Sequence, residues 1–157
     1  MKVKLIQIGK TDLSFIVDAI EYYHKKIVRY HPFEVLTIPD IKNRKSLNEL
    51  QQKKAEADLI LKHLQSSDYI VLLDENGHSM NSVQFSDFIQ NSMIQSIKQL
   101  VFIIGGPYGF DEEIYRIASS KIALSKMTFS HQLVRVIFAE QLYRANTIIK
   151  GEPYHHV

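Results

Sequence analysis

Residues 100–110 read LVFIIGGPYGF, five apolar residues followed at once by a glycine-rich turn. The apolar run is far shorter than the roughly 18 residues that indicate a membrane span. A short, continuous apolar run that ends at glycine is typical of a strand that is buried on both faces. Strands of that kind occur in parallel sheets covered by helices on each side.

On both sides of this strand, short apolar runs alternate with longer segments whose apolar residues step by three and four. The short runs predict strands and the longer segments predict helices. We expect strands at 3–8, 33–38, 69–73, 100–104 and 121–124. We expect one helix that begins at 15, and further helices at 47–64, 83–97, 111–118 and 131–149. Asp12 or Ser14 is the expected cap of the first helix. Without a linker or repeat, the chain predicts one α/β domain over residues 1–157, a parallel sheet flanked by helices.

The composition fits a globular domain and excludes several classes of protein. Of the 157 residues, 45% are hydrophobic and 23% are charged, which excludes disordered and collagen-like chains. The chain has no cysteine, so it has no disulfide, no cysteine nucleophile and no thiolate-bound zinc. With neither a signal peptide nor a membrane span evident, we expect a cytoplasmic protein with no membrane partner. The net charge of +2 allows an RNA partner without requiring one.

Three loops are expected to share one edge of the sheet, because ligands of open parallel sheets bind beyond the carboxyl ends of the strands. They comprise residues 74–77, 105–110 and 124–130. The second loop matches neither the phosphate-binding nor the dinucleotide-binding glycine pattern, but its paired glycines let the backbone approach a ligand closely. The alternative is three ordinary connections, with Asp111 and Ser130 serving as helix caps.

The last helix is apolar around most of its circumference, which a small monomer is unable to cover. A homodimer would bury the apolar surface of this helix that the monomer leaves uncovered. Glu140 and Arg144 have the i,i+4 spacing of an ion pair, whereas Arg135 has alanine at i+4 and needs a partner from elsewhere. The seven histidines lack the spacing of a zinc site, so we expect no metal.

Several blocks of residues, taken with their spacing, resemble the RlmH family: 73–77, 102–110, 124–129, 131–132, 135–136, 140–145 and 153–155. The resemblance implies a SPOUT-class methyltransferase that uses S-adenosyl-L-methionine. Its implied target is N3 of pseudouridine 1915, in the helix 69 loop of 23S rRNA within the assembled ribosome. It also implies a homodimer and a C-terminal trefoil knot. Since chains generally avoid threading, the knot is expected from the resemblance alone.

The family's cofactor contacts carry over to eight positions of this chain, namely Leu73, Gly105, Leu124, Ser125, Lys126, Met127, Thr128 and Phe129. Two neighbouring positions depart from the family pattern. Ser130 stands where many relatives have proline, and Asn76 stands where many have arginine. With Asn76, one candidate phosphate or cofactor contact of the family is missing, but neither departure changes any of the eight implied contacts.

Methyl transfer to an imide nitrogen requires an in-line nucleophile and a way to remove the N3 proton or stabilise the resulting anion. From the place of the tail in the resemblance, the hypothesis is that His155 acts as the base, because an ordinary histidine accepts a proton near neutral pH. Tyr154 would stack on the target base or bond to it, and Arg135 would offset charge on a carbonyl oxygen. The alternative function is a ribosome- or RNA-binding protein without catalysis.

Overall fold

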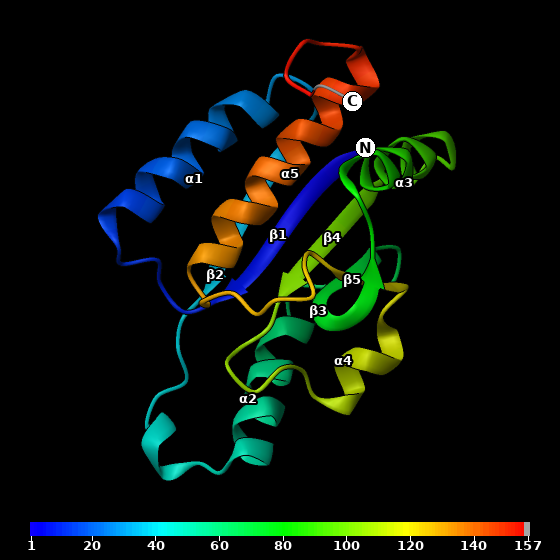
Figure 1. The fold of residues 1–157 in the computed structure, drawn as a ribbon. Helices are drawn as coiled ribbons and strands as arrows, with labels where there is room; N and C mark the ends of the chain where they lie inside the picture. Colours follow the sequence, from blue (N-terminus) through cyan, green and yellow to red (C-terminus); the bar gives the residue numbers. More distant parts are fainter. Residues whose placement is uncertain (156–157) are drawn as a thin grey trace.

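The computed structural model describes residues 1–155, which form a five-stranded parallel sheet with helices on both faces (Figure 1). The strand order is β2-β1-β4-β3-β5, and every neighbouring pair is parallel. The strands are β1 (Lys2–Ile8), β2 (Phe33–Ile38), β3 (Tyr69–Ser79), β4 (Gln99–Ile104) and β5 (Ser120–Ala123). The helices are α1 (Ser14–Ile27), η1 (Arg44–Ser46, a 3-10 turn), α2 (Glu49–Leu61), α3 (Ser82–Ile94), α4 (Glu112–Ile117) and α5 (Leu133–Lys150). The predicted α/β class is confirmed.

The central strand β4 is buried on both faces, as its uninterrupted apolar run predicts. Leu100, Phe102 and Ile104 belong to one hydrophobic cluster, and Val101 and Ile103 belong to another. All five are at most 4% exposed. Because successive side chains of a strand point to opposite faces, an apolar strand of this kind contributes to two cores at once.

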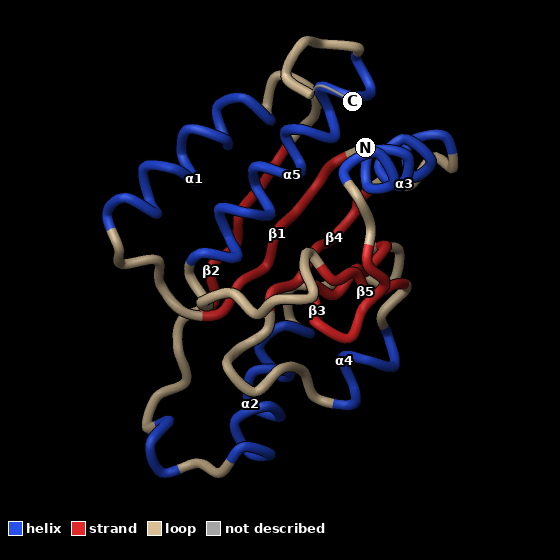
Figure 2. The backbone as a smooth tube through the Cα atoms, in the orientation of Figure 1, coloured by secondary structure: helices blue, strands red, loops and turns tan. Residues whose placement is uncertain are grey.

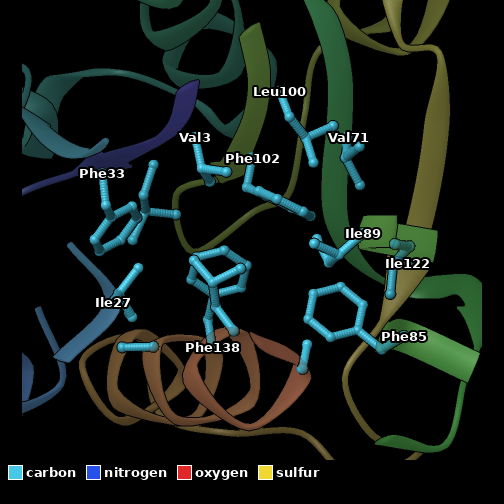
Figure 3. Packing of buried hydrophobic residues seen from close by; sticks show 14 of the residues in the cluster. Val3, Ile27, Phe33, Val71, Phe85, Ile89, Leu100, Phe102, Ile122 and Phe138 are labelled. Atoms are coloured by element: carbon cyan, nitrogen blue, oxygen red, sulfur yellow. The ribbon is translucent and has the colours of Figure 1, made fainter. Parts of the chain in front are cut away.

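The two cores lie between the sheet and two layers of helices (Figure 2). On the first face, Phe102 packs against Phe138 of α5, with ring centroids 4.7 Å apart, and against Phe85 of α3 at 6.1 Å (Figure 3). Helix α1 joins this layer beside α5. On the second face, α2 and α4 pack through Ile60 and Ile114.

Strand β3 is longer than predicted, and this changes the first of the three expected loops. It pairs with β5 through Leu73, shifts register, and pairs again from His78 onward. Residues 74–77 therefore form an irregularity inside a strand, where a free loop was expected. Gly77 permits this close approach, since a Cβ there would lie 2.6 Å from the carbonyl carbon of Ile122.

The predicted cap of α1 is wrong. The helix begins after Leu13, which contributes no side-chain cap, and Ser14 is already its first residue. The amide groups of Asp12 and Leu13 instead donate to Oε1 of Gln132, each at 3.2 Å, while the Gln132 amide donates to the Asp12 carboxylate. The cap comes from a residue 120 positions away, which local sequence patterns do not reveal.

After β5 the chain returns across the sheet to reach the end of β1, where α5 begins (Figure 2). His131 bonds the carbonyl oxygen of Ile8 through Nε2 at 2.8 Å, and Arg135 donates to the same oxygen at 2.6 Å. The trefoil knot stays a prediction. Within residues 1–155, no helix is both long enough and apolar enough to cross a membrane.

Candidate active site

The three loops expected at one edge meet around a cavity of about 650 Å³, which is termed the loop cavity below. This volume lies within the roughly 300–1,000 Å³ of typical small-molecule sites. Seven of the eight positions with implied cofactor contacts line it: Leu73, Gly105, Leu124, Ser125, Met127, Thr128 and Phe129. Lys126, the eighth, is exposed and is not among the lining residues. The loops therefore enclose one site, as predicted from their position at the strand ends.

The charged side chains that line the loop cavity are acidic. Glu49, Asp74 and Glu75 contribute carboxylates, and among the described lining residues none is lysine or arginine. Asp74 is held in place by Tyr115, whose hydroxyl donates to Oδ2 at 2.5 Å, and by the amide of Asn76, which donates to Oδ1 at 2.8 Å. Burial, followed by the bond to Asp74, raises the pKa of Tyr115 to about 12, so the phenol remains a donor. The cavity thus favours a cationic ligand over a phosphate.

The glycine loop lies directly over a buried carboxyl group. A Cβ at Gly106 would collide with the carboxyl group of Glu56, a residue of α2 that is only 4% exposed. Gln52 donates to Oε1 of Glu56 at 2.9 Å. Burial raises the pKa of Glu56, although the bond from Gln52 and the charge of His131 oppose the shift. Only glycine at 106 lets the loop lie this close to the Glu56 side chain of α2.

The third loop presents apolar side chains to the outside of the protomer. Met127 is 77% exposed and Phe129 is 37% exposed, although both line the loop cavity. The Met127 amide donates to Ser125 Oγ at 2.9 Å, which forms a local turn. A loop with large apolar groups in water indicates a surface that a ligand or a second protein covers.

Arg135 lies beneath this region and does not line the loop cavity. Its side chain is fully buried, and its guanidinium donates to Thr11 Oγ1 and to the carbonyl oxygen of Ile8, both at 2.6 Å. Burial lowers the pKa of Arg135, against the opposing charges of Asp40 and Asp12. The expectation that its partner comes from outside α5 is confirmed. Through these contacts Arg135 supports the loop between β1 and α1. Direct contact of Arg135 with a substrate stays a prediction.

Tyr154 and His155 follow the last residue of α5, whereas the loop cavity lies at the start of this helix. The helix has 18 residues, which corresponds to about 27 Å at 1.5 Å per residue. His131 and Val134 line the cavity at its start, whereas the tail follows Lys150 at its end. Tyr154 and His155 therefore do not meet the expected cofactor contacts within one chain, whereas Arg135 lies near them.

The tail is nevertheless held by specific contacts. Tyr154 donates from its hydroxyl to Glu140 Oε1 at 3.2 Å, and its ring centroid lies 4.7 Å from that of Tyr143. Glu140 also pairs with Arg144 at 2.5 Å, which confirms the ion pair predicted from their spacing. Arg144 in turn contacts Nδ1 of His155 at 3.2 Å. The last described residues therefore have a defined orientation.

Comparisons with known proteins decide the family. A family model described as "Predicted SPOUT methyltransferase" matches residues 1–155. The chain belongs to the SPOUT methyltransferase family. It is 57% identical to "Ribosomal RNA large subunit methyltransferase H" of Parabacteroides distasonis over 156 residues, 99% of each chain. Proteins of the same name in Christiangramia forsetii and Flavobacterium johnsoniae are 55% and 53% identical, again over 99% of each chain. The resemblance predicted from the motifs is confirmed.

The two departures from the family pattern have visible local effects in this SPOUT protein. Ser130 still acts as a cap, since its Oγ accepts from the Leu133 amide at 3.2 Å. Asn76 contributes its backbone amide to Asp74, a contact that does not depend on the side chain. Among residues 1–155, no cluster of three or more His, Cys, Asp or Glu is placed to hold a metal ion.

Sequence reasoning missed the acidic residues of the site. Asp74 falls in an expected loop, and Glu49 and Glu56 fall in the helix expected at 47–64, which is mostly polar. A mostly polar helix gives no periodic signal that singles out one carboxyl group for burial. The adjacent glycines at 105 and 106 were the available signal, because such a pair indicates that another group of the protein or a ligand lies close to the backbone of that turn.

Proposed function

We propose that the chain is an S-adenosyl-L-methionine-dependent methyltransferase that acts on N3 of pseudouridine 1915, in the helix 69 loop of 23S rRNA. The relatives are named as methyltransferases of large-subunit ribosomal RNA, and the chain matches them over 99% of their length. The observation that carries the proposal is the loop cavity, which is acidic, free of lysine and arginine among its described lining residues, and built from all three loops. The assembled ribosome in the cytoplasm is the proposed substrate.

The residues of the loop cavity fit this cofactor. S-adenosyl-L-methionine carries a sulfonium and an ammonium group, and the carboxylates of Asp74 and Glu75 complement positive charge. Gly105 and Gly106 line the cavity and add no side chain of their own, so a flat heterocycle is able to approach their backbone. When bound, the cofactor supplies a methyl carbon that bonds to N3 while its bond to sulfur breaks and the electron pair stays on sulfur. The loops contribute the position of the reacting groups.

The proposal includes a homodimer in which each site is shared. Because α5 separates the loop cavity from Tyr154 and His155, one chain alone does not bring them together. Two copies paired with their α5 helices antiparallel would place the tail of each beside the cavity of the other. Leu13, Phe15 and Leu133, exposed near the starts of α1 and α5, provide apolar surface for such a contact. Val136, Ile137 and Ile148 are only half-buried within the protomer.

Three measurements test this proposal. Calorimetry is expected to detect binding of S-adenosyl-L-methionine, and the purified protein is expected to transfer a labelled methyl group to ribosomes from cells that lack it. Mass mapping of the 23S rRNA should then locate the methyl group on the helix 69 pseudouridine. Ribosome binding without methyl transfer would instead support the non-catalytic alternative, and no binding of the cofactor would overturn the enzymatic proposal.

A further inference from the structure

The side chain of Arg144 is fixed so that one of its nitrogens faces His155. Its Nε and Nη2 donate to Glu140 Oε1 at 3.0 and 2.5 Å, and its guanidinium carbon lies 4.8 Å from the centre of the Tyr154 ring. The ion pair is shielded, with 25% of the Arg144 side chain and 18% of the Glu140 side chain exposed. The remaining nitrogen, Nη1, lies 3.2 Å from His155 Nδ1.

This contact determines which nitrogen of His155 carries hydrogen. A guanidinium group has only N–H donors and stays protonated, so it is unable to accept a hydrogen bond. Nδ1 of His155 must therefore be the acceptor, with its lone pair directed at Arg144. A neutral imidazole carries one hydrogen, which is then on Nε2. Within residues 1–155, Arg144 is the hydrogen-bond partner of the His155 ring, which leaves Nε2–H for a substrate.

The arrangement is the reverse of the carboxylate–histidine pairs that generate a base. In those pairs a carboxylate accepts from Nδ1–H, which leaves the lone pair of Nε2 available to remove a proton. Here a cation donates to Nδ1, and a proton taken up on that nitrogen would break the hydrogen bond. It would also place a second positive charge beside Arg144, in a cluster that already contains the ammonium of Lys26, 5.9 Å from the centre of the Tyr154 ring. Glu140 is the nearby carboxylate, and Arg144 and Tyr154 already occupy its Oε1.

We propose that His155 acts as a hydrogen-bond donor through Nε2–H and that Arg144 is the positioning residue that sets this tautomer. The inference rests on the proposed function and replaces the hypothesis that His155 is the base. The N3 proton of the imide passes to solvent water, and the negative charge spreads onto the adjoining carbonyl oxygens. Nε2–H donates to one of these oxygens, while the N3 lone pair forms the bond to the methyl carbon and the carbon–sulfur bond breaks.

Two substitutions separate a donor from a base. His155→Gln keeps an N–H donor but is unable to accept the proton, whereas His155→Phe keeps a ring and has neither property. We expect His155→Gln to retain methylation of ribosomes within about tenfold of wild type, and His155→Phe to lose about a hundredfold or more, as when an oxyanion donor is removed. His63→Gln, at an exposed position outside the site, is the matched control. An equal, large loss in both His155 variants would overturn the proposal.

A second measurement does not depend on activity. Nitrogen-15 NMR of the labelled wild-type protein, with the His155 signals assigned by their loss in His155→Gln, is expected to show protonated Nε2 and unprotonated Nδ1. Arg144→Met should shift that ring to a mixture of tautomers. Protonated Nδ1 in the wild type would overturn the proposal even if the protein methylates ribosomes. Absence of methylation by the wild type with the expected tautomer would count against the proposed function instead.

Discussion

At the scale of single residues, the loop cavity depends on Glu56, a buried carboxyl group that is not among its lining residues. The buried carboxyl group of Glu56 packs against the turn at Gly106, and the contact is so close that it restricts which residue fits at either position. Burial raises the pKa of Glu56 above its ordinary value of 4.5, because the folded protein disfavours the charged form. The ionised carboxylate of Glu56 therefore lowers the free energy of unfolding, and it does so only at a pH at which the carboxyl group is ionised.

The replacement Glu56→Gln is expected to stabilise the protein at neutral pH. The free energy of unfolding of the wild type falls as the pH rises from about 4.5 through the raised native pKa, since the unfolded chain releases the proton first. Glutamine keeps an oxygen that accepts from Gln52 and has no charge to bury. Urea unfolding from pH 4 to 8 should show a gain for Glu56→Gln that grows with pH and disappears below about 4.5.

The exposed Glu21 on α1 supplies the matched control, because water solvates its carboxylate in both the folded and the unfolded states. Glu21→Gln should therefore lack this pH-dependent gain. A Glu56→Gln protein that is less stable than wild type at pH 7 would show that the ionised carboxylate makes a favourable contact instead.

At the scale of elements, the start of α5 and the two residues before it organise the cavity edge. His131, Gln132 and Arg135 all bond to residues 8–12, so the start of α5 fixes the end of β1 and the start of α1. Local patterns predicted where these elements lie: the strand at 33–38 has the predicted bounds, and the apolar runs located the others. They did not predict this junction, because each of its hydrogen bonds joins residues more than 100 positions apart.

Gln132→Ala tests the junction. The substitution removes the acceptor for the amides of Asp12 and Leu13, and α1 has no side-chain cap of its own. Loss of a helix cap typically costs about 1 kcal/mol, so the free energy of unfolding should fall by about that amount. Hydrogen exchange should also become faster in the first turn of α1. The exposed Gln65→Ala is the control, and an equal change in both variants would contradict a capping role for Gln132.

At the scale of the whole molecule, the sequence predicts the loop cavity but not how the tail and the cavity are divided between two chains. The cavity was predictable because parallel strands end at one edge, which brings together Leu73, Gly105 and residues 124–129. The separation of Tyr154 and His155 from that edge was not anticipated, although it follows from the length of one uninterrupted helix. A long helix places its two ends in different surroundings, and in the proposed homodimer a second chain that runs in the opposite direction would bridge them.

A shared site predicts that two inactive variants restore each other. Gly106→Val damages the cavity through Glu56, and His155→Phe damages the tail, so each variant alone should be inactive. Random pairing makes about half of the dimers mixed, and each mixed dimer has one site with an intact cavity and an intact tail, giving about a quarter of wild-type methylation. Co-expression of Gly106→Val with the double variant Gly106→Val/His155→Phe is the control, since no cavity there is intact. If each chain used its own tail, the mixture would stay as inactive as that control, because no chain in it has both parts.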